Sequence, residues 1–170
     1  MSVNKSCLII ISFLAAIMIS GCAAMHSKPG TTTTVILIRH AEKDEKGFLS
    51  EKGHEHAKAL VGAVMNLGVQ KIYSPDLGRN LDTVRPLAEH LGIDITLTPT
   101  ISVPMVGSIC EEILTEHAGK VVLWVGNVSG NLQLIYKRLG GEGTGPVEYG
   151  QLYILTIPDK GSTHVVKTTF

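Results

Sequence analysis

Short apolar runs alternate along this chain with segments whose apolar residues recur every three or four positions. The runs are rich in β-branched residues, which favours strands. Val35–Ile38 and Lys120–Val125 are the most apolar, and the second of these is expected at the centre of a sheet. Strands are predicted at residues 35–38, 71–74, 94–97, 120–125, 151–157 and, at an edge of the sheet, 164–169.

Helical periodicity separates these runs. Ser50 can cap a first helix whose inner stripe runs from Ala57 to Leu67. The stripe from Leu77 to Leu91 predicts a second helix, kinked or divided at Pro86. After an irregular segment from Thr98 to Gly107, two more helices are expected, at residues 108–117 and around residues 132–139. This alternation predicts an α/β three-layer sandwich, with a mainly parallel sheet and helices on both faces.

The first two dozen residues differ in kind from this pattern. Lys5 precedes an apolar run from Cys7 to Ile19, which has the layout of a secretory signal and is too short to favour a membrane span. The end of this segment, Ile19-Ser20-Gly21-Cys22, resembles a bacterial lipobox. That resemblance implies cleavage before Cys22 and a lipid on its sulfur. Ordinary cleavage near Ala23-Ala24 and an uncleaved anchor are the alternatives.

These features divide the chain into a lipoprotein-type signal peptide (1–21), a small, polar tether (22–33) and a domain (34–170). A lipid on Cys22 would anchor the domain to a membrane in the cell envelope, outside the cytoplasm. Because Ala23 and no aspartate follows Cys22, the outer membrane facing the periplasm is expected if the cell is Gram-negative. Only Cys110 would then remain, so no internal disulfide is available.

Composition narrows the range of partners. The chain has 170 residues, of which 44% are hydrophobic, so one domain can bury a substantial core. It carries 15 basic and 15 acidic side chains and has no basic run, which argues against a nucleic-acid partner. Any site for an anion must therefore be local.

Charged side chains follow the first predicted strand abruptly, at Arg39, His40 and Glu42. In open α/β sheets, ligands bind at the carboxyl ends of the strands. The loops after the second and fourth strands would bring Arg79 and Asn127 to the same edge. A strand end that meets solvent, with Arg39 and Glu42 as surface charges, is the alternative.

This set of side chains suits phosphoryl transfer. Arginine matches phosphate oxygens in a bidentate way, and a helix N-terminus offers free N–H groups to an anion. A histidine facing such groups can attack phosphorus. The positive groups would stabilise the equatorial oxygens during the transfer.

Several motifs resemble those of the histidine phosphatase superfamily. Arg39-His40-Ala41-Glu42 is similar to its Arg-His-Gly-Glu signature, and Leu49–Gly53 to its Leu-Thr/Ser-x-x-Gly segment. Tyr73–Arg79 followed by Thr83 is similar to its Ser-x-Leu-x-Arg-x-x-x-Thr segment.

The resemblance implies a phosphoglycerate-mutase-like fold and a role for each matching residue. His40 would be the nucleophile that forms a phosphohistidine. Arg39 and Arg79 would bind the phosphate. Glu42 would orient the arginine or histidine side chains without contacting the phosphate itself. No metal or other cofactor would be needed.

Two departures from the family pattern stand out. The family usually has a second histidine where this chain has Asn127, and an asparagine cannot become cationic. We expect Asn127 to bind phosphate but to cost roughly 1.5–3 kcal/mol in the transition state, or about ten- to a hundredfold in rate. The family often supplies an acid after the third strand, but residues 99–110 contain none, and Glu111 and Glu112 are the nearest carboxylates.

Three functional hypotheses follow. The first is an extracytoplasmic phosphomonoester hydrolase acting through phospho-His40, with activity reduced because Asn127 replaces the second histidine. The second is a degenerate phosphatase-fold module that binds phosphorylated ligands without efficient turnover. A purely structural lipoprotein would not explain two arginines beside a histidine. The substrate, whether a phosphorylated small molecule or an envelope component, stays open.

Overall fold

The computed structural model describes residues 24–98 and 103–170. The predicted signal peptide and the lipidation site at Cys22 lie outside the described residues. The six strands are β1 (Thr32–Arg39), β2 (Val69–Pro75), β3 (Ile95–Thr98), β4 (Val121–Gly126), β5 (Gln151–Pro158) and β6 (His164–Thr169). The helices are α2 (Glu51–Val64), α3 (Gly78–Leu91), α4 (Val103–Thr115) and α5 (Leu132–Arg138).

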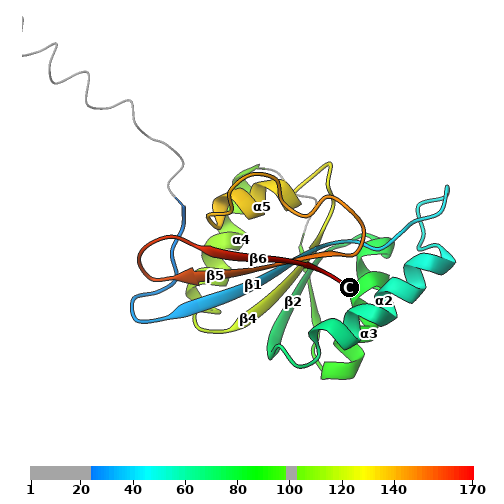
Figure 1. Ribbon diagram of the computed structural model, residues 1–170, viewed down its shortest axis with the longest axis horizontal. Helices are drawn as coiled ribbons and strands as arrows, with labels where there is room; N and C mark the ends of the chain where they lie inside the picture. The colour runs from blue at the N-terminus through cyan, green and yellow to red at the C-terminus, as the bar shows by residue number, and fades with distance from the viewer. Residues whose placement is uncertain (1–23, 99–102) are drawn as a thin grey trace, which may run out of the picture.

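The strands form one sheet in the order β3-β2-β4-β1-β5-β6 (Figure 1). The first four strands of this order are parallel, whereas β5 runs antiparallel to β1 and β6 antiparallel to β5. All six predicted strands are present, β4 lies inside the sheet, and β6 lies at its edge. The predicted α/β architecture is therefore confirmed.

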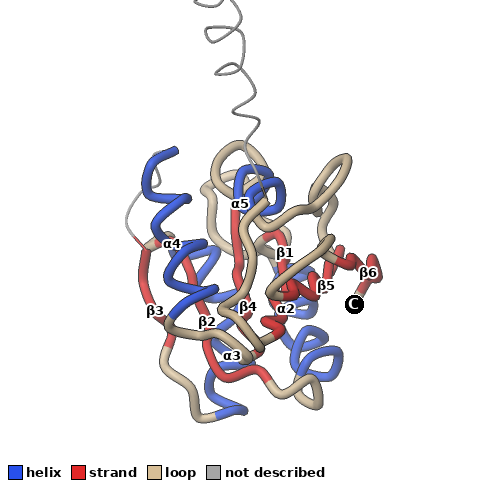
Figure 2. The backbone as a smooth tube through the Cα atoms, turned by 90° about the vertical axis from the view of Figure 1, so that its left-hand side faces the viewer, coloured by secondary structure: helices blue, strands red, loops and turns tan. Residues whose placement is uncertain are grey.

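The side chains of β1 alternate between two hydrophobic cores. Ile36 and Ile38 pack with residues of α2 and α3, whereas Val35 and Leu37 pack with residues of α4 and α5. The sheet is thus the middle of three layers, with α2 and α3 on one face and α4 and α5 on the other (Figure 2). Both faces of β1 are buried, which explains why its sequence reads as a continuous apolar run.

Several element boundaries differ from the expectation. Helix α4 already begins at Val103, inside the segment expected to be irregular. Leu67 lies beyond the end of α2 and is 40% exposed, while Leu77 precedes α3 and is 39% exposed. Neither therefore belongs to a helical stripe. Helix α3 continues through Pro86 as one element.

Residues expected to form a tether lie along the domain instead. Strand β1 begins at Thr32, two positions before the expected start of the domain. The backbone N–H of Met25 donates to Arg138 O, and that of Ser27 donates to Pro158 O. The Met25 side chain also packs against the core on the α4 and α5 face. The folded unit therefore includes these residues, because they satisfy backbone groups at the ends of α5 and β5.

The topology gathers the ends of three parallel strands at one edge. Arg39 at the end of β1 is in register with Gly126 at the end of β4, and β2 ends beside them. The loops after β1, β2 and β4 therefore meet there, as expected for parallel neighbours. Within the described ranges, no helix is long and apolar enough to cross a membrane.

Candidate functional site

The backbone around His40 is fixed by three elements. The N–H of His40 donates to Gly126 O over 3.1 Å, which ties the end of β1 to β4. The next N–H, of Ala41, donates to the Thr83 hydroxyl over 2.9 Å, and that hydroxyl donates to Arg79 O over 2.7 Å. Thr83 thus joins the His40 loop to the first turn of α3, which fixes the backbones of His40 and Arg79 relative to each other.

The His40 ring is held in one tautomer. Its Nδ1 lies 2.7 Å from the carbonyl oxygen of Ala41. Because a carbonyl oxygen can only accept a hydrogen bond, Nδ1 carries the proton and Nε2 keeps a free electron pair. Only 4% of the residue is exposed. His40 therefore has the protonation pattern that a nitrogen nucleophile needs.

Arg39 lies against the loop that precedes β5. Its Nη1 donates to Val147 O over 2.7 Å, and its guanidinium carbon lies 3.7 Å from the centre of the Tyr149 ring. Its Nε is buried and has no hydrogen-bond partner among the described residues. A buried N–H of a cation is costly to leave unpaired, which fits a donor intended for a ligand.

Arg79, in the first turn of α3 after β2, contacts Asn127. Its Nη2 donates to Asn127 Oδ1 over 3.0 Å, and its Nε is buried without a partner in the described part of the chain. Because arginine only donates, the amide oxygen of Asn127 must face it, and the NH2 group is the one left for a ligand. The predicted group His40, Arg39, Arg79 and Asn127 is therefore gathered at this edge of the sheet.

A cleft of about 230 Å³ opens beside Arg79 and Asn127. Its walls are the loop after β2 and the turn after β4. One lining residue, Asp76, carries a carboxylate and was not among the site residues predicted from the sequence. The lining residues are Pro75, Asp76, Leu77, Arg79, Asn127, Ser129, Gly130 and Asn131.

Comparison with known proteins agrees with this geometry. Residues 35–102, which include His40, Arg79 and Thr83, match the family model described as "Histidine phosphatase superfamily (branch 1)". This segment, which is less than half of the chain, is similar to the histidine phosphatase superfamily.

Solved structures of phosphatases share the fold at low sequence identity. The protein histidine phosphatase SixA complexed with tungstate aligns with a TM-score of 0.64 and 14% identity, over 80% of this chain and 96% of that one. A variant of the phosphoserine phosphatase from Entamoeba histolytica, in complex with phosphoserine, aligns with a TM-score of 0.63 and 14% identity, over 79% and 95% of the two chains.

A curated relative matches part of the chain in sequence. The 8-oxo-(d)GTP phosphatase of Mycolicibacterium smegmatis is 33% identical over 73 residues, which is 38% of this chain. The matched part spans 23% of that enzyme's length. The similarity is therefore local, and it does not extend to the rest of that protein.

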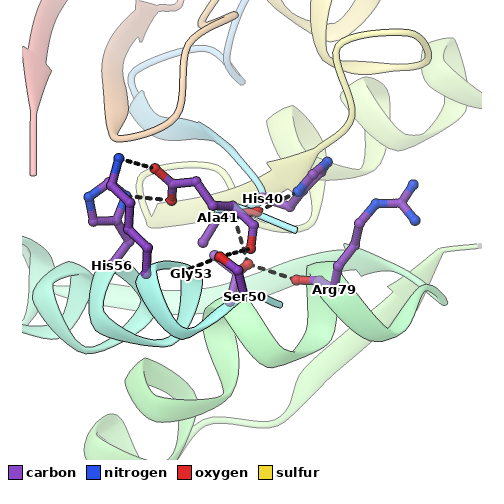
Figure 3. Close-up of polar contacts among 9 residues, drawn as sticks. His40, Ala41, Ser50, Gly53, His56 and Arg79 are labelled. Carbon is purple, nitrogen blue, oxygen red and sulfur yellow. Dashed lines mark hydrogen bonds and ion pairs between the residues drawn. The ribbon is translucent and has the colours of Figure 1, made fainter. Parts of the chain in front are cut away.

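Glu42 does not have the role that resemblance to the superfamily implied. One of its carboxylate oxygens lies 3.0 Å from Lys52 Nζ, and the other lies 2.8 Å from His56 Nδ1. Figure 3 shows His56 on the side of the loop away from His40 and Arg79. Burial alone would raise the pKa of Glu42, but the hydrogen bond and charge of Lys52 and the charge of His56 hold it below its ordinary value. Glu42 thus braces the His40 loop against α2.

The start of α2 packs closely on the same loop (Figure 3). Ser50 caps the helix, as predicted, by accepting the N–H of Gly53. A β-carbon on Gly53 would lie 2.1 Å from the carbonyl oxygen of Glu42, so only glycine fits there. This contact explains the glycine of the Leu49–Gly53 motif in physical terms.

The other carboxylates considered for proton donation lie elsewhere. Glu112 accepts a hydrogen bond from the Tyr73 hydroxyl over 2.5 Å. His117 Nε2 lies 2.9 Å from the Tyr73 hydroxyl oxygen. Glu111 is exposed on α4. No cluster of three or more His, Cys, Asp or Glu side chains that could hold a metal ion occurs in the described ranges.

The pKa of His40 gives a prediction for pH dependence. Burial, together with the charges of Arg79, Arg39 and Lys43, lowers this pKa to about 4, although the hydrogen bond to Ala41 acts in the opposite sense. His40 is therefore neutral above about pH 4 and loses its nucleophilic electron pair below it. We expect kcat/KM, corrected for ionisation of the substrate, to stay level from pH 7 to 5 and to fall only near pH 4. An acid limb at pH 6.5 would contradict a buried, neutral nucleophile.

Proposed function

We propose that this protein hydrolyses phosphomonoesters outside the cytoplasm through a phosphohistidine on His40. The observation that carries the proposal is a neutral histidine, with Nε2 unprotonated, beside two guanidinium groups whose buried Nε atoms lack partners among the described residues. A phosphate dianion would supply acceptors for these donors and a phosphorus atom for the nucleophile.

The chemistry divides into two displacements. Nε2 forms a bond to phosphorus while the bond from phosphorus to the ester oxygen breaks, and the leaving oxygen takes up a proton. A water molecule then attacks phosphorus from the vacated side, breaks the nitrogen–phosphorus bond and releases inorganic phosphate. Arg39 and Arg79 stabilise the oxygens during both steps. Asp76, in the cleft beside Arg79, is the candidate proton carrier: as the carboxylic acid it protonates the leaving oxygen, and the carboxylate so formed takes the proton that the attacking water loses.

The cleft favours a small leaving group. Its volume of about 230 Å³ accommodates a small organic group more readily than a folded protein surface. The similar proteins named above act on chemically different phosphates, so similarity to the family does not choose among them. A phosphorylated small molecule or an exposed phosphate of an envelope component is the proposed substrate class.

Turnover of a generic aryl phosphate tests the activity directly. Purified protein should release nitrophenol from p-nitrophenyl phosphate and, after rapid acid-free quenching, carry a phosphoryl label that is stable in base and labile in acid. An N–P bond behaves in this way, whereas a serine phosphoester is stable in acid. Absence of both turnover and label at every pH between 4 and 8 would overturn the proposal.

Asn127 favours a second candidate, a module that binds phosphorylated ligands with little turnover. Its oxygen is occupied by Arg79, so it offers a ligand only a neutral amide donor. Inorganic phosphate should then raise the melting temperature although hydrolysis is undetectable.

Replacing Asn127 with histidine decides between the candidates. We expect Asn127→His to raise kcat about tenfold while phosphate affinity changes little, because a cationic donor acts mainly on the charge that develops in the transition state. The gain is at the lower end of the range because an imidazolium cannot accept from Arg79, so the hydrogen bond that Asn127 Oδ1 now accepts is lost. Steady-state kinetics and calorimetry of phosphate binding give the two numbers. An unchanged or lower kcat would show that Asn127 does not limit turnover.

The proposed location rests on Cys22 as a lipid attachment site. Three residues from Cys22 to Met25 can span at most about 11 Å, and Met25 is bonded to the end of α5. Pro158, at the nearby end of β5, pairs with Thr32 at the start of β1. Strand β1 is eight residues long, and His40 follows its other end. The site would thus lie about 25 Å along the sheet from the anchored edge, which favours substrates dissolved in the surrounding compartment.

Replacing Cys22 tests the anchor. Wild-type protein expressed with its full signal should sediment with membranes in high salt, and Cys22→Ser should appear in the soluble fraction or keep its signal. Cys110→Ala is the matched control, because Cys110 is buried and should not affect sedimentation. Soluble wild-type protein without a lipid mass would contradict the anchor and leave the phosphatase assay unaffected.

A further inference from the structure

One aromatic ring contacts both the candidate nucleophile and a phosphate-binding arginine. The Tyr149 ring lies 3.7 Å from the guanidinium carbon of Arg39, within the range of a cation–π contact. The same ring meets the His40 imidazole edge to face, with ring centres 5.7 Å apart and planes at 60°. Tyr149 follows β1 by more than a hundred residues and matches none of the motifs found in the sequence.

The loop that carries Tyr149 is itself fixed. The side-chain oxygen of Gln151 accepts the N–H groups of Val147 and Glu148 over 2.8 and 3.1 Å. Gly150 adopts φ of +78°, which favours glycine, and its carbonyl accepts the N–H of Phe170 over 2.9 Å. Residues 146–149 therefore form a fixed support.

The support determines which donors of Arg39 face the site. The carbonyl of Val147 takes Nη1, and the Tyr149 ring covers one face of the guanidinium. The buried, unpartnered Nε lies on the other edge of the group, together with Nη2. A guanidinium held in this way presents one edge to an anion without having to be ordered when the ligand binds.

We propose that Tyr149 is a positioning residue that holds Arg39 in its phosphate-binding orientation and limits access of water to His40. This role rests on the proposed phosphate chemistry of the same site. The ring and not the hydroxyl supplies the effect, because the face of the ring contacts the guanidinium. The loop 146–149 thus contacts the site through Arg39 and His40.

Two variants separate the ring from the hydroxyl. Tyr149→Phe keeps the aromatic face, whereas Tyr149→Leu keeps apolar bulk but removes it. Phe48→Leu is the matched control, because Phe48 is 61% exposed on the loop after β1. Thermal unfolding first establishes that all three variants fold.

The first measurement needs neither ligand nor turnover. Nitrogen-15 relaxation of the Arg39 side-chain Nε–H reports its order in the free protein. We expect a rigid group in wild type, Tyr149→Phe and Phe48→Leu, and a mobile one in Tyr149→Leu. Equal order in wild type and Tyr149→Leu would overturn the proposal, whether or not the protein proves to be a phosphatase.

The second measurement follows binding and catalysis. We expect Tyr149→Leu to weaken the binding of inorganic phosphate about three- to thirtyfold, measured by calorimetry, with a matching rise in KM for p-nitrophenyl phosphate. Tyr149→Phe should restore both to within about twofold of wild type. If Tyr149→Phe is as damaging as Tyr149→Leu, the hydroxyl acts and the proposal is wrong. If no variant or wild type turns over, the proposed function fails, while phosphate affinity still decides the role of Tyr149.

Discussion

Replacing His40 with alanine is expected to lower kcat for an aryl phosphate by about a thousandfold or more and to abolish the acid-labile phosphoryl label. The large effect follows from the role of Nε2, which forms a covalent bond that no neighbouring group can replace. His40 is buried and its ring is held by Ala41 O, so no other described histidine can move into its position. The measurement combines stopped assays with quantification of the label on denatured protein.

Controls separate lost chemistry from lost structure. His40→Asn retains a polar side chain at the same position and should be as inactive as His40→Ala. His54→Ala, in the exposed part of α2, should keep wild-type activity and label. Both His40 variants should still gain stability from inorganic phosphate, because Arg39 and Arg79 remain. Substantial turnover by His40→Ala would place the nucleophile elsewhere.

The sequence was sufficient to predict that the principal groups of the site lie together. A buried strand that ends in Arg39 and His40, with Arg79 and Asn127 after two other strands, predicts one edge of a parallel sheet. The register of Arg39 with Gly126 confirms that prediction. It succeeded because parallel neighbours necessarily end at the same edge, so the position of each loop follows from the strand pattern alone.

The orientation of individual side chains could not be predicted in the same way. Glu42 is two residues from His40, but its carboxylate pairs with Lys52 and His56, which the helical path of α2 brings to the opposite side. Lys52 is ten positions from Glu42 in the sequence, farther than Arg39. The close packing of Gly53 on Glu42 brings the start of α2 to this carboxylate.

Tyr149 was missed for a different reason. Its loop has no periodic pattern, and the antiparallel pairing of β5 with β1 is what returns it to the site. A cation–π contact between Arg39 and Tyr149 leaves no spacing that could be recognised in the sequence. Contacts of this kind depend on tertiary structure and can be identified only once the fold is known.

Asn127 has a double effect on the site. Compared with the usual histidine, it withholds a cation from the transition state, which disfavours turnover. At the same time its oxygen accepts from Arg79, which holds this arginine beside the cleft. On the proposed function, Asn127 is therefore expected to weaken catalysis while it supports the binding of the anion, so turnover and binding should respond differently to mutations at Arg79 and at Asn127.

Replacing Arg79 with methionine is the second change with a large expected effect. Each charged hydrogen bond contributes roughly 1.5–3 kcal/mol, so loss of a fork that makes two of them should lower kcat/KM about a hundred- to ten-thousandfold. Phosphate affinity, measured by calorimetry, should fall at least about tenfold. Arg79→Lys keeps the charge but loses the planar fork, and it should lie between wild type and Arg79→Met.

Arg85 provides the matched control for Arg79. It lies on the same helix but is exposed and pairs with Asp82 over 3.0 Å, away from the phosphate groups. Arg85→Met should therefore leave both constants unchanged, since a surface ion pair contributes little. If Arg79→Met and Arg85→Met behave alike, Arg79 does not bind the phosphate. If Arg79→Met loses turnover but binds phosphate as wild type does, Arg79 acts only on the transition state and Arg39 holds the anion in the ground state.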